Sequence, residues 1–161
     1  MDNFRLQLTC LEGGVCLMGV GNTELGDDGL GVQLAERLAG DGVPNVVVAG
    51  TSPECFLGCG ANAQAAHIVF LDAVDFGGAP GSVVFLNARE MENRFPQIST
   101  HKLSLGLLAK CVEANGRTHA WLLGVQPESL RPSHELSSTV KRTVDVLEHW
   151  ISDHFVTSAE I

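Results

Sequence analysis

The alternation of short apolar runs with longer segments of helical periodicity most constrains what this chain can fold into. The first run, residues 15–20, is continuously apolar and ends at Gly21 and Asn22, as expected of a strand buried on both faces. Four further runs repeat this type, at residues 46–49, 68–71, 83–86 and 120–123. The pattern predicts an α/β fold in three layers, with about five strands in a mostly parallel twisted sheet and helices on both faces.

Segments of helical periodicity lie between and after these runs. Ser52 and Pro53 have the cap residue and first-turn proline of a short helix start. Thr100 can cap a further helix that ends near residues 115–116, and the last helix begins at about Ser138. The link over residues 73–82 could instead form a hairpin, so the topology stays open there. The predicted inward-facing stripes are Leu30, Leu34, Ala35 and Leu38, then Leu103, Leu107, Leu108 and Cys111, then Val140, Val144, Leu147 and Ile151.

Length and composition bound the domain organisation and the class of partner. At 161 residues, of which 45% are hydrophobic, the chain can form one core. We expect a single domain over residues 1–161, with its core at about 15–152 and loosely held ends at 1–12 and 155–161. No apolar run approaches a membrane span and the first residues do not resemble a leader, which predicts a cytoplasmic protein without a membrane partner. A net charge of -9 disfavours nucleic acid, and a monomer is the expected oligomeric state.

The five cysteines form an odd set without a disulfide framework, so reduced thiols are expected. Cys16 and Cys111 lie in apolar stretches and are interpreted as small core residues. Cys55 and Cys59 would share one face of a helix, which makes a soft-metal pair conceivable. No second Cys/His pair completes a tetrahedral set, however, which argues against that site.

An acidic, glycine-rich turn at residues 21–29 directly follows the first predicted strand. Its position is typical of a phosphate loop, but a dinucleotide fingerprint would need glycine where Glu24 stands. Glu24, Asp27 and Asp28 would also repel a pyrophosphate, so no nucleotide cofactor is expected. The positive end of a helix could explain Asp27 or Asp28. It does not explain the surrounding glycines, which indicate a tight turn or a close approach.

Other polar groups stand at the ends of the predicted elements. Asp72 closes an apolar strand, and a charged carboxylate there needs a partner, which could be a cation, a metal or backbone N–H groups. Asp75 is interpreted as the cap of a turn before Gly77. His101 lies in the first turn of a predicted helix, where it is either a surface or capping residue or a ligand. Two carboxylates and this imidazole could form an N/O metal site with open positions.

Residues 50–54 follow the second predicted strand and allow two interpretations. Gly50, Thr51 and Ser52 could bind an incoming peptide through their hydroxyl and N–H groups, or Ser52 could simply cap the short helix. The chain has neither the Gly-x-Ser-x-Gly elbow of many serine hydrolases nor the His-Glu-x-x-His helix of zincins. No activated nucleophile is therefore indicated.

Taken together, these segments resemble the maturation endopeptidases that process the large subunit of nickel-iron hydrogenases. The resemblance spans roughly residues 15–150 and rests on five segments in the family's order. They are Gly19-Val20-Gly21-Asn22 with Gly26-Asp27-Asp28-Gly29, then Gly50-Thr51-Ser52-Pro53-Glu54, Leu71-Asp72-Ala73, Thr100-His101-Lys102-Leu103 and Gly124-Val125-Gln126-Pro127-Glu128.

The resemblance implies a metal site and a reaction. Its metal-binding positions correspond to Asp28, Asp72 and His101, and the metal is nickel supplied by the substrate. The implied partner is the precursor of the hydrogenase large subunit, from which one peptide bond near the C-terminus is hydrolysed after nickel insertion. Relatives often have Asp-Gly where this chain has Val48-Ala49, so a role for that additional Asp does not transfer.

Two other classes of function stay open at this point. The same three residues could bind nickel in a metal-handling module that cuts nothing. The chain could also be a hydrolase of small substrates on a related α/β fold. Neither the general base nor any nucleophile is identified by the sequence.

Overall fold

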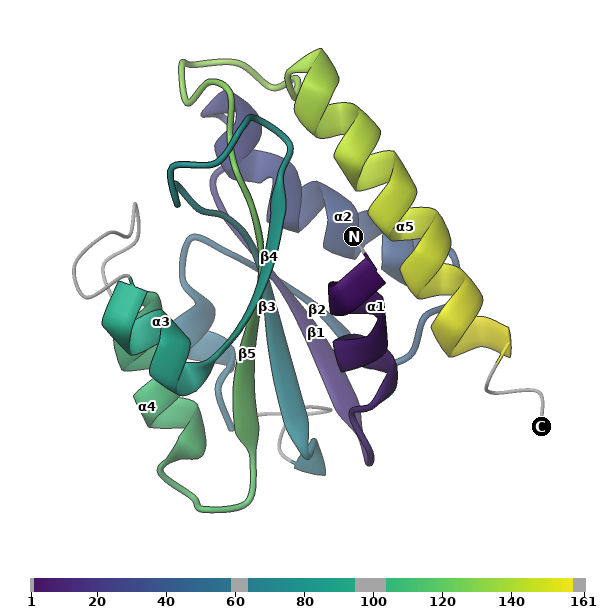
Figure 1. The fold of residues 1–161 in the computed structure, drawn as a ribbon, viewed down its shortest axis with the longest axis vertical. Coiled ribbons are helices and arrows are strands. Elements are labelled where there is room, and N and C mark those ends of the chain that lie inside the picture. The colour runs from purple at the N-terminus through teal and green to yellow at the C-terminus, as the bar shows by residue number, and fades with distance from the viewer. Residues whose placement is uncertain (1, 59–63, 95–103, 158–161) are drawn as a thin grey trace.

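In the computed structural model, which describes residues 2–58, 64–94 and 104–157, five strands form one sheet (Figure 1). Their order is β2-β1-β3-β5-β4, and all neighbours are parallel except β4, which is antiparallel to β5. The predicted sheet is confirmed. Because β5 lies between β3 and β4, the link over residues 73–82 does not form a hairpin. The strands are β1 (Val15–Val20), β2 (Val46–Gly50), β3 (His67–Ala73), β4 (Val83–Asn87) and β5 (His119–Val125).

Helices cover both faces of the sheet, as predicted. Helices α1, α2 and α5 lie on one side of the strands and α3 and α4 on the other (Figure 1). Two short 3-10 turns, η1 and η2, follow β1 and β2. The elements are α1 (Asp2–Thr9), η1 (Gly26–Gly29), α2 (Leu30–Gly40), η2 (Pro53–Phe56), α3 (Ala88–Arg94), α4 (Leu105–Glu113) and α5 (Ser138–Thr157).

Alternate residues of each central strand serve the two apolar layers. In β1, Leu17 packs with α2 and α5, whereas Cys16 and Met18 pack with α3 and α4. The predicted stripes of α2 and α5 are fully buried. Burial raises the pKa of the Cys16 thiol to about 11, which keeps it protonated as a small core residue, as expected.

Helix α4 corrects the predicted stripe around residues 103–111. It begins at Leu105, with Ser104 as the N-cap accepting from the Leu107 N–H at 3.2 Å. The predicted cap Thr100 and the stripe residue Leu103 lie outside the described residues. The buried positions are Leu105, Leu108, Ala109 and Val112. Only Leu108 of the described predicted positions is buried, while Leu107 and Cys111 are exposed. The interpretation of Cys111 as a core residue is therefore wrong, because the apolar face is rotated by about one position.

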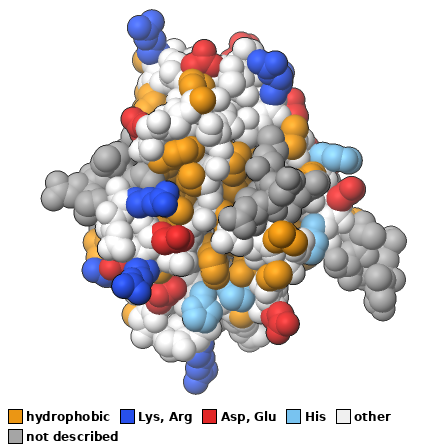
Figure 2. Space-filling view, viewed as in Figure 1, with side chains coloured by type: hydrophobic (Ala, Val, Ile, Leu, Met, Phe, Trp, Pro, Cys, Tyr) orange, Lys and Arg blue, Asp and Glu red, His pale blue; other side chains and the backbone are white. Residues whose placement is uncertain are grey.

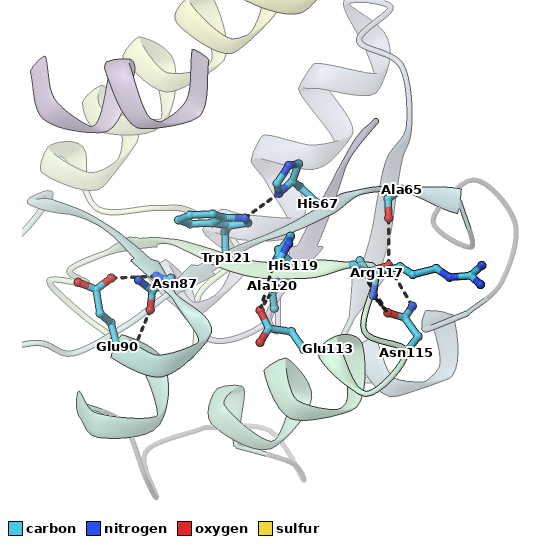
Figure 3. A network of polar contacts seen from close by, with 11 residues as sticks. Ala65, His67, Asn87, Glu90, Glu113, Asn115, Arg117, His119, Ala120 and Trp121 are labelled. Atoms are coloured by element: carbon cyan, nitrogen blue, oxygen red, sulfur yellow. Dashed lines mark hydrogen bonds and ion pairs between the residues drawn. The ribbon is translucent and has the colours of Figure 1, made fainter. Parts of the chain in front are cut away.

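Helix α3 was not predicted. Its sequence contains a reciprocal cap, in which the Asn87 N–H donates to Glu90 Oε2 and the Glu90 N–H donates to Asn87 Oδ1, both at 2.9 Å (Figure 3). An Asn followed three residues later by Glu is the expected signal of such a start.

Residues near both ends of the described chain pack against the core. Leu8 of α1 is only 3% exposed and belongs to the core cluster formed with α2 and α5. Helix α5 extends to Thr157, and Phe155 packs against the same cluster. Leu8 and Phe155 therefore both contact the core. Within the described residues, no helix is both long enough and apolar enough to span a membrane.

Candidate functional site

The carboxyl ends of β1, β2, β3 and β5 meet at one edge of the sheet, at the top of Figure 1. Gly19 of β1 pairs with Leu71 of β3, so the turn after β1 begins beside Asp72. The turn carries η1, which contacts β3. Asp28 and Asp72, distant in sequence, are thereby brought to the same edge, as functional groups in parallel sheets commonly are.

Glycines let the backbone of this edge pack without side chains between its segments. A Cβ on Gly31, in the first turn of α2, would clash with the carbonyl oxygens of Val20 and Leu71. A Cβ on Gly21 would clash with the Asp28 carbonyl oxygen, and Gly21 has φ +140°, which disfavours other residues. The close approach that the glycines predicted is therefore between backbone segments of this chain.

Asp28 is buried, with only 1% of its surface exposed. Its Oδ2 accepts a hydrogen bond from the Asn22 N–H at 3.0 Å, inside the same turn. The Asn22 side chain accepts in turn from the Glu24 N–H at 2.9 Å. The turn therefore closes on itself around the Asp28 carboxylate.

Asp72 is also buried, at 2% exposure, and lies one residue before the end of β3. Its Oδ1 accepts from the Ala73 N–H at 2.9 Å. A backbone N–H was one of the three partners expected for this carboxylate, and it is confirmed. Two acidic side chains held out of water at one edge form a strongly cation-attracting arrangement.

Asp27 differs from its neighbour Asp28 in its partners, a difference that physical reasoning from the sequence did not predict. It is 1% exposed and accepts from the N–H groups of Glu128 and Ser129 and from both the N–H and the hydroxyl of Ser137. These partners lie more than 100 residues away in the chain, so no local sequence signal could have identified them.

The loop after β2 adjoins the acidic turn. Gly50 has φ +61°, and its carbonyl oxygen accepts from the Gly21 N–H at 3.0 Å. Pro53 opens η2 as predicted, although in the described part of the chain the Ser52 side chain makes no capping bond. Gly50, Thr51 and Ser52 therefore lie beside the turn that carries Asp28, where an incoming peptide could meet them.

Gln126, directly after β5, organises a further loop at this edge. Its Oε1 accepts from the N–H groups of Phe76 and Gly78, and its Nε2 donates to Asp75 Oδ1 at 3.1 Å. The hydrogen bond from Gln126, followed by that from the Gly77 N–H, lowers the pKa of Asp75 below its usual value. The predicted role of Asp75 as a turn cap is confirmed by the second bond. No role for the Gln126 side chain was predicted from the sequence.

His101 and Cys59 lie outside the described residues, so neither the complete triad nor the Cys55–Cys59 pair is tested. In the described ranges, no three His, Cys, Asp or Glu side chains gather as a metal site. The two described members of the predicted triad fit a divalent cation by their chemistry, because both offer carboxylate oxygens at one buried edge.

A second polar cluster occupies the opposite, amino ends of β3 and β5 (Figure 3). The Trp121 indole N–H donates to His67 Nδ1 at 3.0 Å, and His67 Nε2 lies 3.1 Å from the Glu12 carbonyl oxygen. The His67 and His119 rings stack with centroids 5.6 Å apart. Figure 2 shows imidazole side chains side by side at the surface near this end of the strands. Both nitrogens of His67 are engaged, which argues against a metal ligand here.

The comparisons with known proteins agree with one another. A family model described as hydrogenase maturation protease matches residues 30–154, a stretch that includes Asp72 and begins two residues after Asp28. The hydrogenase 2 maturation protease of Escherichia coli K12 is 31% identical over 139 residues, which are 81% of this chain and 84% of that protein. The hydrogenase 3 maturation protease of the same strain is 29% identical over 141 residues, 83% of this chain and 88% of that protein.

Solved structures show the same likeness. The crystal structure of the [NiFe] hydrogenase maturation protease HycI from Thermococcus kodakarensis KOD1 superposes with a TM-score of 0.80 at 27% identity, covering 94% of this chain and 98% of that one. The hydrogenase maturating endopeptidase HybD from E. coli gives a TM-score of 0.70 at 30% identity, with 86% and 89% covered. Sequence and fold thus point to the same group of proteins.

Proposed function

This chain belongs to the hydrogenase maturation protease family, and from that premise we propose that it is an endopeptidase that removes the C-terminal extension of a nickel-iron hydrogenase large-subunit precursor. The observation that carries the proposal is the placement of Asp28 and Asp72. Both are buried carboxylates at the carboxyl edge of the sheet, on segments that are adjacent in the fold.

Nickel in the precursor is the proposed recognition element. Asp28 and Asp72 place two carboxylates out of water at one edge of the sheet, and this arrangement favours an incoming metal ion. Asp28 and Asp72 would contribute oxygen ligands, and His101, from its place in the family resemblance, would contribute a nitrogen. The metal belongs to the substrate. These residues can bind at its open coordination positions only when nickel has been inserted into the precursor.

The reaction adds one water across a peptide bond, giving a new carboxylate on the mature subunit and a free amine on the released extension. The protein's part is to bind and orient the nickel-bearing segment so that the scissile bond is held against the edge. Gly50, Thr51 and Ser52 are proposed to bind that segment beside the acidic turn. No residue is assigned as general base.

A gel assay of purified protein with the precursor tests the proposal. Nickel-loaded precursor should be shortened, and the same precursor without nickel should stay intact. Equal cleavage of both forms would contradict recognition through nickel. Cleavage of neither form, with nickel binding retained, would instead favour a metal-handling module.

We also propose that the protein acts as a monomer in the cytoplasm and that residues 1–161 form one domain. Light scattering after size-exclusion chromatography checks the monomeric state, because a dimer would have twice the chain mass of 17.1 kDa.

A further inference from the structure

Asp27 and Asp28 are adjacent in η1 and equally buried, but their carboxylates bind different parts of the chain. Asp28 accepts from Asn22 within its own turn. The Asp27 carboxylate accepts from Glu128, Ser129 and Ser137, all in the segment that joins β5 to α5. Asp28 therefore bonds inside the turn of the candidate site, whereas Asp27 bonds to the loop beside that turn.

The acceptor capacity of Asp27 is filled by four donors. Its Oδ2 accepts from the Glu128 N–H at 2.8 Å, the Ser129 N–H at 2.9 Å and the Ser137 hydroxyl at 2.9 Å, and its Oδ1 accepts from the Ser137 N–H at 2.7 Å. A carboxylate has about four acceptor sites on two oxygens, whereas an amide of the same size replaces one oxygen with a donor. Among side chains of this size, only aspartate can satisfy all four donors.

Backbone hydrogen bonds join the same two segments at neighbouring positions. The Gly26 N–H donates to the Ser133 carbonyl at 2.7 Å, and the Asp27 N–H donates to the Ser129 carbonyl at 3.0 Å. The Ser133 N–H donates to the Glu24 carbonyl at 3.0 Å. The loop over residues 127–137, which lies at the top of Figure 1, is thereby fixed to the turn that carries Asp28.

The turn that carries Asp28 is held by its own hydrogen bonds and by this loop. Leu25, at the start of η1, has no polar side chain with which to cap it. Inside the turn the Asp28 N–H donates to the Leu25 carbonyl at 3.2 Å, and from outside η1 is held through Asp27, the residue before Asp28. Loss of the hydrogen bonds of Asp27 would therefore rotate or shift the Asp28 carboxylate.

We propose that Asp27 is a positioning residue for peptide cleavage: it fixes Asp28 and the loop over residues 127–137 relative to one another without touching the substrate. The proposal rests on the proposed function of the Asp28 and Asp72 edge. Groups that orient a ligand from outside typically contribute ~10–100-fold to metal affinity or activity.

The test compares kcat and KM for nickel-loaded precursor in four proteins. Asp27→Asn should lower kcat by ~10–100-fold. Ser137→Ala, which removes one donor and keeps the carboxylate, should lower kcat by a smaller factor in the same direction. Glu24→Gln removes an exposed carboxylate of the same turn and should leave both constants unchanged. KM should change little in all three variants, because Asp27, Ser137 and Glu24 are not proposed to contact the substrate.

A double variant separates positioning from simple loss of structure. If Ser137 acts through Asp27, combining Asp27→Asn with Ser137→Ala should cost no more than Asp27→Asn alone. Additive losses, or a kcat loss that only follows the folded fraction measured by circular dichroism, would overturn the proposal. Full kcat in folded Asp27→Asn would also overturn it, and if that variant does not fold, full kcat in Ser137→Ala decides against it.

Failure of the wider function gives a different result. If the unmodified protein does not cut nickel-loaded precursor, or if Asp28→Asn cuts it at the full rate, the proposed function of the edge is wrong and this inference falls with it. If both of those results are as expected, a full rate in Asp27→Asn contradicts the positioning role alone.

Discussion

The two ends of β3 and β5 carry polar side chains in opposite settings. At the carboxyl ends, Asp28 and Asp72 are almost completely buried and lie on segments that are adjacent only in the fold. At the amino ends, His67 and Trp121 bond to each other across neighbouring strands, and His119 stacks on His67 near the surface (Figure 3). One end brings together an acid from the turn after β1 and an acid from the end of β3, and the other joins residues of neighbouring strands that bond to each other.

The difference favours the carboxyl ends of the strands as the place where a ligand binds. Strand pairing brings His67 and His119 together without any loop, so their cluster can be explained by the sheet alone. The acids are brought together by the turn after β1, packed on β3 through Gly31, and by the loop that holds Asp27. An arrangement that needs several loops to bury charge is unfavourable for stability alone, which favours a functional origin.

The largest expected effect is at the carboxyl end. Asp28→Asn and Asp72→Asn each keep the side-chain volume but remove a charged oxygen ligand. Each should lower the cleavage rate of nickel-loaded precursor by about 100-fold or more, since even groups that only orient ligands contribute ~10–100-fold. A 100-fold loss is ~2.7 kcal/mol of activation free energy. Initial rates on gels measure it.

Two controls make that result specific. Glu24→Gln, in the same turn but exposed, should cut at the full rate. The thermal midpoint of both Asp variants should stay near that of the unmodified protein, because neither substitution leaves a cavity. Full activity in Asp28→Asn or Asp72→Asn would remove the reason for distinguishing the two ends of the sheet.

The sequence predicted the strands and α5 because their signals are local. Continuous apolar runs identified all five strands to within about two residues, and one stripe identified the buried face of α5. Helix α4 was placed with its stripe rotated, because Leu107 and Cys111 fit a helical spacing equally well without knowledge of where the helix begins. Helix α3 was missed although Asn87 and Glu90 carried its capping signal.

The candidate site was predictable only in part. Asp72 could be identified because a charge at the end of a buried strand is conspicuous in any sequence. Asp28 was singled out through the family resemblance, since physical reasoning alone gave Asp27 and Asp28 the same explanation. Their roles separate through partners 101 to 110 residues away from Asp27, a distance that no local pattern reveals. The role of His101 stays a prediction.

A smaller effect is expected at the amino end. Trp121→Phe removes the N–H that donates to His67 and keeps a ring that can stack on Phe85, whose centroid is 5.3 Å from that of Trp121. Loss of one hydrogen bond should lower the free energy of unfolding by ~0.5–1.5 kcal/mol. Urea unfolding measures the loss. Cleavage of the precursor should continue at the full rate, and a large fall in kcat would show that the two ends are coupled.

The smallest effect concerns pH and again belongs to the amino end. Trp121 can only donate, so His67 Nδ1 must accept, and the neutral ring has its hydrogen on Nε2 facing the Glu12 carbonyl. The pKa of His67 is lowered, mainly by burial and to a smaller extent by the neighbouring His119. The hydrogen bond with the Glu12 carbonyl raises the pKa and offsets part of this effect. Glu113 Oε1 lies 3.9 Å from His119 Nδ1 and is an acidic group beside this second imidazole.

Protonation of His67 should therefore destabilise the fold as pH falls. An imidazole in the unfolded chain takes up its proton near pH 6.5, before the folded His67 does, so stability is fully present above that pH and declines below it until the lowered folded pKa is passed. The difference in urea midpoint between about pH 7.5 and about pH 5.5 should be smaller in His67→Gln than in the unmodified protein. His149→Gln, which removes an exposed imidazole from α5, should leave the difference unchanged. If His67→Gln declines as steeply as the unmodified protein, the acid sensitivity lies elsewhere, and the carboxyl end, with its buried acids, becomes the place to look for it.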